Sequence, residues 1–446
     1  MPRTVGRRSP GCAIERPATG NASCGEGANV ITNAAIWVIC AASIGGVLTR
    51  ARGIGEWIYA LAGALLLTAL GLVPIRDVVK AVGRGTDVYL FLTGMMLLAE
   101  LARREGVFDW VAGHAVGAAR GSRWRLFGLI YAVGVVVTSV LSNDATAVVL
   151  TPAVAAAVRK AEAAPLPHLL ACAFIANAAS FVLPISNPAN LVVFAGSMPA
   201  LGRWLIVFGL PSLLAIAATF AILALVTRGD LRGDLAAGVT VPALATNGRI
   251  TLFGIGATAL ALLAASAAGE PLGLTTCLAA AAVFLSVIIR DRRAAAEVVR
   301  AVSWGVIVLV GGLFVLVQGM EVTGLLDATR RGIAAIAAWP IGLAVLGAGG
   351  ITGLAANAMN NLPAGLVAGS SISALAGHEA LRGAVAIGID LGPNLSVTGS
   401  LATVLWLIAL RREGIDVSAW SFLRVGALVM PPALFAALES LTVTAR

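Results

Sequence analysis

The stretch VLSNDATAVVLTPAV, residues 140–154, interrupts a long apolar run with three consecutive polar residues, Ser142, Asn143 and Asp144. An ionisable side chain in a bilayer is costly and usually faces a partner or a water-filled cavity. Non-helical backbone at that depth is tolerated only inside protein or beside such a cavity. The stretch therefore predicts the tip of a re-entrant hairpin, with two apolar arms and a polar turn.

The composition of the whole chain agrees with a membrane setting. Of its 446 residues 59% are hydrophobic and 12% are charged, whereas soluble domains have about 25% charged residues. Apolar runs of bilayer-spanning length recur without the alternation of barrel strands. The net charge of +9 comes from Arg clusters in short loops, as in membrane proteins. We expect an all-α polytopic membrane protein whose partners include membrane lipid and exclude nucleic acid.

The polar tip has a counterpart in the second half of the chain. Asn143 lies 218 residues before Asn361, which stands in the stretch MNNLPAG, residues 359–365. The same separation relates three further pairs: Gly94 with Gly312, Gly106 with Gly324 and Asp109 with Asp327. Such self-similarity at a fixed separation predicts two structurally equivalent halves.

The apolar runs and the polar interruption of each half predict five membrane spans and one re-entrant hairpin. Because five is odd, the second half is expected to be inverted relative to the first. The expected spans are 31–49, 54–73, 87–104, 166–197 and 201–227, then 249–268, 271–289, 303–320, 378–410 and 417–440. The expected organisation is a disordered tail at 1–28, a first repeat at 29–227 with its tip at 142–144, a cytoplasmic linker at 228–248, and an inverted repeat at 249–446 with its tip at 360–362.

The distribution of Arg and Lys predicts the orientation. Most basic loop residues fall on the side where the third span ends, at Arg103 and Arg104. The positive-inside rule makes that side cytoplasmic and places both termini outside.

Broken helices at matching positions of inverted halves indicate a transporter binding site. Two tips and two Pro-interrupted helices are expected to meet near the midplane. The candidate substrate-binding residues are Ser142, Asn143, Thr146, Ser186, Asn187, Asn190, Asn360, Asn361, Asn394, Ser396 and Thr398. The simpler interpretation is that each Asn only joins neighbouring helices, at ~0.6 kcal/mol per bond. Four clusters related by one repeat favour the site.

Asp144 and Asp390 are the most deeply placed acids and are the candidates for proton coupling. For Asp390 the alternative is a helix-end cap beside Gly392 and Pro393. The histidines lack the helical pair spacing of metal ligands, and no phosphate-binding loop occurs. We therefore expect no metal, no cofactor, no enzyme activity, and energy from an ion gradient or a separate ATPase.

Three stretches resemble the bacterial arsenite permease family of the ion-transporter superfamily: SNDATAVVLTP (142–152), MNNLPAGLV (359–367) and GIDLGPNLSVTGSLATVLWL (388–407). The similarity covers almost all of 31–440. It implies an elevator-type fold of two inverted repeats that exports arsenite or antimonite across the inner membrane, commonly in exchange for protons. A soluble arsenite-stimulated ATPase, with which some members pair, is a candidate partner.

In sodium-coupled relatives the tip Ser-Asn pairs hold the cation. Here Asp144 stands where those relatives often have Thr, which favours protons. Some close members have Lys at the position of Asn394. This chain lacks that fixed positive charge, so its coupling and its substrate can differ from theirs. A Na⁺/H⁺ antiporter, another anion or neutral-solute transporter of the same superfamily, and a neutral-solute channel remain alternatives, and oligomeric state is not predicted.

Overall fold

The computed structural model describes residues 22–49, 54–195, 197–236, 243–373 and 378–445, with side chains from residue 31 onward. Within these ranges the regular secondary structure is helical, which confirms the all-α prediction. The helices of the first half are α1 (Ala22–Thr49), α2 (Glu56–Ala69), α3 (Ile75–Arg84), α4 (Thr86–Arg104), α5 (Val107–Ala118), α6 (Arg123–Val140), α7 (Asn143–Ala145), the π-helical η2 (Thr146–Leu150), α8 (Thr151–Lys160), α9 (Pro165–Ala178), α10 (Pro188–Val193) and α11 (Leu201–Val226).

The second half repeats this order. Its helices are α12 (Thr246–Ala268), α13 (Leu272–Ile288), α14 (Arg293–Ala301), α15 (Gly305–Val322), α16 (Leu325–Ala337), α17 (Ile341–Met359), α18 (Asn361–Ile372), α19 (Glu379–Leu391), the short 3₁₀ turns η3 (Gly392–Asn394) and η4 (Val397–Gly399), α20 (Leu401–Arg412) and α21 (Ala419–Thr444). The start of α1 at Ala22 makes residues 22–28, expected in the tail, helical. The rest of that predicted tail lies outside the described residues.

Seven helices of the described chain are long and apolar enough to cross a bilayer, or eight if the bent pair α3–α4 counts as one span. The protein is therefore a multi-pass membrane protein. Five of the ten expected spans, those at α1, α11, α12, α15 and α21, are among the seven, and the span at α4 belongs to the bent pair. The expected spans at α2 and α13 are apolar but shorter than 18 residues. The two Pro-interrupted spans are broken into α9 with α10 and α19 with α20. The first hairpin arms, α6 and α17, are among the seven. Helix length alone thus does not distinguish these arms from spans.

Residues paired by the 218-residue separation have the same structural roles. Gly106 and Gly324 have φ angles of 73° and 83°, a region that favours glycine, and each precedes the helix that follows the third expected span. A Cβ atom at Gly94 would lie 2.7 Å from the Thr276 carbonyl oxygen, and one at Gly312 would lie 2.8 Å from the Ala60 carbonyl carbon. These glycines permit close crossings of α4 with α13 and of α15 with α2.

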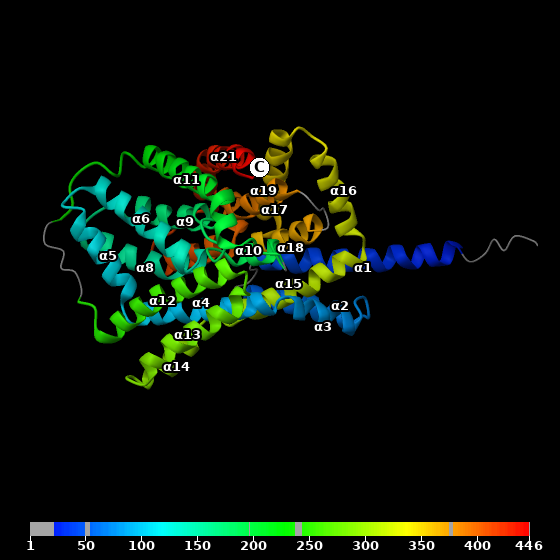
Figure 1. Ribbon diagram of the computed structural model, residues 1–446, viewed down its shortest axis with the longest axis horizontal. Coiled ribbons are helices and arrows are strands. Elements are labelled where there is room, and N and C mark those ends of the chain that lie inside the picture. Colours follow the sequence, from blue (N-terminus) through cyan, green and yellow to red (C-terminus); the bar gives the residue numbers. More distant parts are fainter. Residues whose placement is uncertain (1–21, 50–53, 196, 237–242, 374–377, 446) are drawn as a thin grey trace, which may run out of the picture.

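The two halves are interleaved in space. Helix α2 packs on α15, and its counterpart α13 packs on α4. The last helices of the halves, α11 and α21, lie side by side (Figure 1). Each broken helix contacts the hairpin of the other half, α10 with α18 and α20 with η2. This reciprocity agrees with the predicted repeat, while its inversion across the membrane stays a prediction.

Both polar tips end one helix and start the next. At the first tip the Ser142 Oγ accepts a hydrogen bond from the Ala145 N–H (3.2 Å). At the second, Asn360 has a φ of 76° and its Oδ1 accepts from the Leu362 N–H (3.3 Å). The side chains that make the stretches polar therefore cap the second arms, which satisfies N–H groups that a helix start leaves free.

Candidate functional site

The two hairpin tips and the two broken helices meet around one small cavity. Its lining comes from both halves of the chain, with α4 and α15 closing the sides. The lining residues are Leu92, Asn143, Asp144, Asn187, Pro188, Val306, Asn361, Leu362, Leu401 and Ala402. We refer to this space as the tip cavity.

Four helices begin at the wall of the tip cavity. The continuous helical segment 143–160 and α18 start at the two tips, and α10 and α20 start at the broken helices. Helix starts present unpaired N–H groups and the positive end of the helix dipole. At the first tip the N–H groups of Asn143, Asp144 and Ala145 are already bonded within the protein, to the Ser186 carbonyl, the Asn143 Oδ1 and the Ser142 Oγ. What these helix starts offer a polar or anionic solute is therefore mainly the positive end of the helix dipole.

Asp144 and Asn361 have the freest polar side chains in the tip cavity. Within the described chain, neither makes a side-chain hydrogen bond or an ion pair. The Asn143 Oδ1 accepts from the Asp144 N–H (2.9 Å), and the amide nitrogen of Asn143 is free to donate. The Asn187 Oδ1 caps α10 at Ala189 N (2.9 Å). Both tips thus contribute a group that is free to bind a solute.

A larger cavity continues from the tip cavity along α4. The two share Leu92, Asp144, Pro188 and Val306, and the larger one ends at Glu100 and at the residues 301–303 before α15. Asp144 therefore lines both spaces. Glu100 was not among the predicted site residues. It lies on the same face of α4 as the lining residues Leu92 and Met96, eight and four residues after them.

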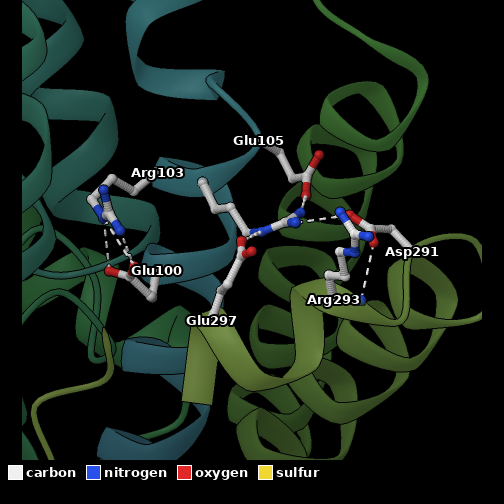
Figure 2. A network of polar contacts seen from close by, with 7 residues as sticks. Glu100, Arg103, Glu105, Asp291, Arg293 and Glu297 are labelled. Atoms are coloured by element: carbon white, nitrogen blue, oxygen red, sulfur yellow. Dashed lines mark hydrogen bonds and ion pairs between the residues drawn. The ribbon is translucent and has the colours of Figure 1, made fainter. Parts of the chain in front are cut away.

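Charged residues surround the Glu100 end of the larger cavity. The Arg103 Nε donates to both carboxylate oxygens of Glu100, each at 2.9 Å. Arg104 binds Asp291 and Glu297, each at 2.7 Å, as well as Glu105 (Figure 2). These contacts fasten α14 and the loop before it to the end of α4.

A further small cavity reaches the second tip from another direction. It is lined by Asn360 and Pro363 of the tip and by residues from the ends of α1 and α2, including Val47 and Glu56. Each tip is therefore accessible from a separate space.

The remaining predicted site residues make hydrogen bonds within the protein and do not line the tip cavity. The Asn394 Nδ2 donates to the Phe174 carbonyl and its Oδ1 accepts from Asn177, each at 3.0 Å. The other bonds are Thr146 with Thr138, Ser186 with the Ser139 carbonyl, Asn190 with the Ser180 carbonyl, and Ser396 and Thr398 with Asn357. Their contact with a solute stays a prediction.

Asp390 is fully buried and lies behind the tip cavity. Its Oδ1 accepts from the Asn187 Nδ2 at 2.7 Å, and its Oδ2 has no hydrogen-bond partner. The neighbouring turn η3 has no side-chain cap, so the carboxyl group contacts the site through Asn187 rather than capping a helix. Its role in proton coupling stays a prediction.

Sequence reasoning missed three polar residues, the buried Asn177 and Thr403 and the half-buried Asn357. They hold the broken second-half helix in place: Asn177 bonds Asn394 and Thr403, and the Asn357 Nδ2 donates to the Gly392 carbonyl at 2.9 Å. Asn177 stands in an apolar run and gave no signal, whereas Asn357 lies three residues before Asn360 and Thr403 three residues after Ser400, a helical spacing that could have pointed to both.

Comparisons with known proteins agree with this architecture. The sequence profile of the citrate transporter family (CitMHS) matches residues 35–389. The arsenical pump membrane protein of Escherichia coli strain K12 is 30% identical over 416 residues, covering 89% of this chain and 95% of that protein. That of Yersinia enterocolitica is 29% identical over 404 residues, covering 88% and 94%.

The crystal structure of the Alcanivorax borkumensis YdaH transporter has a similar fold. The TM-score is 0.51 at 15% sequence identity, over 82% of this chain and 86% of that one. At this identity the similarity is a statement about the fold alone. The chain therefore belongs to the citrate transporter family, together with the arsenical pump membrane proteins, and is a membrane transporter rather than an enzyme.

Proposed function

We propose that this protein exports arsenite or antimonite across the inner membrane in exchange for protons. The observation that carries the proposal is the tip cavity, in which one acid and free amide groups from both halves face a common space. The names of its relatives, arsenical pump membrane proteins, support the substrate class.

The lining of the cavity favours a neutral polyhydroxyl solute. Arsenous acid carries three hydroxyl groups and no charge at physiological pH. Its oxygens would accept from the amides of Asn143 and Asn361, and its hydroxyls would donate to Asp144. Among the described residues neither Lys nor Arg lines the tip cavity or its extension. Carboxylates such as citrate usually recruit Arg, and here they would meet the charge of Asp144.

Proton exchange would follow from mutually exclusive occupancy of Asp144. Ionised, the carboxylate accepts a hydroxyl hydrogen bond from the solute; protonated, it has lost that charge-assisted bond. Binding of the solute therefore expels a proton, and release of the solute allows one to return. Asp390 contributes by holding Asn187, and a second proton on its unpaired Oδ2 is part of the same proposal.

Transport would proceed by elevator-type alternating access. The tip cavity continues toward the basic end of α4, which is the predicted cytoplasmic side, with both termini outside. Protons and solute would use this path, past Glu100. A soluble ATPase is a candidate partner at that face.

The test is transport in proteoliposomes under an imposed pH gradient, with arsenite, antimonite, citrate and sodium supplied separately. We expect arsenite and antimonite to accumulate against their gradients when protons flow the opposite way. Citrate is the second candidate because helix starts also bind carboxylates. Accumulation of citrate alone, sodium-driven transport without arsenite movement, or arsenite flux that only runs downhill would each overturn the proposal.

A further inference from the structure

The second arm of the first hairpin contains one turn of π-helix directly after the tip. The turn is η2, Thr146–Leu150, between the tip residues of α7 and the helix α8. At its end the Thr151 N–H donates to the Thr146 carbonyl, five residues back instead of four. Such a turn takes up one residue more than a turn of α-helix, and π-helical turns are frequent at functional sites.

Side chains on both arms of the hairpin hold this turn in place. The Thr151 Oγ1 donates a second hydrogen bond to the Thr146 carbonyl at 3.0 Å, and both residues are buried. Pro152 has no N–H, so it gives the Val148 carbonyl no α-helical hydrogen bond. On the first arm, the Thr138 Oγ1 lies 2.8 Å from the Thr146 Oγ1, and one of the two hydroxyls donates to the other. The π turn is therefore fixed by specific contacts.

The extra residue decides the direction of Asp144. Asp144 precedes Thr151 by seven residues, and in an uninterrupted α-helix the two would lie within about 20° of one face. That face of α8 continues through Val154 and Val158, which are fully buried, and Thr151 is 1% exposed. An ionised carboxylate on a fully buried face is costly. An uninterrupted helix would thus bury Asp144 away from the solute.

The π turn removes this conflict. Because it takes up one residue, it rotates the tip relative to α8 by one α-helical step, about 100°. Asp144 then lines the tip cavity and the larger cavity, while Thr151 stays buried. The matching arm of the second half, α18, is a regular α-helix, and Leu362 stands there at the position of Asp144. The π turn thus belongs to the arm that carries the acid.

We propose that the π turn aims Asp144 into the cavities, with Thr151 and Pro152 as positioning residues that act through Asp144. The direction of the side chain is a matter of geometry alone. Its consequence for transport rests on the proposed function: with residue 144 turned away from the cavities, the solute and the proton no longer compete. Removal of one residue from the turn should compensate for loss of the π turn, because an α-helix one residue shorter keeps the same rotation between Asp144 and Thr151.

The test is thiol labelling of the detergent-purified full chain that carries Asp144→Cys. Modification of position 144 by a small water-soluble methanethiosulfonate is measured by peptide mass spectrometry. We expect labelling when the turn is intact and loss of labelling when Thr151→Val and Pro152→Ala are added, since the helix can then close as an α-helix. Further deletion of Ala147, which lines neither cavity, should restore labelling. Thr151→Ser keeps the hydroxyl and should leave labelling unchanged.

Misfolding does not imitate the expected result. Unfolding would expose position 144 and raise its labelling, and the buried native Cys172 reports unfolding by becoming labelled in the same sample. The proposal is overturned if position 144 is still labelled with Thr151→Val and Pro152→Ala while Cys172 stays protected. It is equally overturned if deletion of Ala147 leaves position 144 unlabelled.

The parallel measurement is the pH dependence of arsenite affinity in chains that keep Asp144. It should be lost with Thr151→Val and Pro152→Ala, return when Ala147 is also deleted, and match the wild type in Thr151→Ser. A wild-type chain that binds no arsenite would overturn the proposed function, whereas the labelling would still decide what aims Asp144.

Discussion

The replacement of Asp144 by Asn separates proton coupling from solute binding. The two side chains have nearly the same shape, and the Asp144 carboxylate makes no hydrogen bond or ion pair within the described chain. The substitution therefore breaks no contact of the fold, and we expect the free energy of unfolding to change by less than ~0.5 kcal/mol.

The effect on affinity follows from the change in hydrogen-bond type. A hydrogen bond to a charged group contributes about 1.5–3 kcal/mol, and a neutral one about 0.5–1.5 kcal/mol. Loss of the charge should thus weaken arsenite binding by roughly tenfold. Because Asn does not exchange a proton, the remaining arsenite flux should ignore the pH gradient.

The assay is arsenite uptake into proteoliposomes with and without a pH gradient, together with thermal unfolding of the purified variant. Asp109→Asn, an exposed acid-to-amide change at the start of α5, is the matched control and should keep gradient-driven uptake. The reasoning is refuted if Asp144→Asn accumulates arsenite under the gradient as the wild type does.

Three further predictions test the site and the fold. Asn361→Ala should weaken arsenite binding by several-fold and leave the melting temperature unchanged. Asn394→Ala should lower the free energy of unfolding by about 1–3 kcal/mol, because it leaves the buried Asn177 and the Phe174 carbonyl without their hydrogen bonds. The opposite pattern, measured by binding and thermal unfolding, would show that the two residues have exchanged roles. Gly312→Ala should cost about 1–3 kcal/mol by overpacking against the backbone of α2, and an unchanged melting temperature would contradict the close crossing. The hydrogen bond from Arg104 holds the pKa of Asp291 below its usual range. The ionised Asp291 therefore stabilises the fold above its unfolded pKa, near 4, and this stabilisation is lost as the pH falls through the lower folded pKa. Asp291→Asn should flatten the acid limb of a plot of melting temperature against pH, and a limb identical to the wild type would refute the contact.

The two polar breaks between helices, at Ser142 and Asn360, were predictable because their signal is local and repeated. That they are tips of re-entrant hairpins stays a prediction. Ser142 and Asn360 interrupt apolar runs, and the separation of Asn143 from Asn361 recurs at glycines that are required at helix crossings and turns. At these crossings and turns the backbone requires glycine, so the repeat can be seen directly in the residue types.

The direction in which each polar side chain points was not predictable. Asn361 and Asn394 stand at comparable breaks, yet Asn361 lines the cavity and Asn394 bonds to Asn177 and Phe174. The difference depends on which helices cross at each break. The partners of Asn394 lie more than two hundred residues away in the sequence, so no residue spacing near Asn394 indicates them. The cavity between Asp144 and Glu100 escaped prediction for the same reason.

The dependence of arsenite affinity on pH tests the central claim most directly, since it reports whether solute and proton compete for Asp144. Isothermal titration of the purified protein from pH 8 to pH 5 should show affinity falling toward the acid limit by up to about tenfold per pH unit, with proton release on binding, and Asp144→Asn should show neither. Arsenite affinity that is the same at every pH, or equally pH-dependent in Asp144→Asn, would contradict the account.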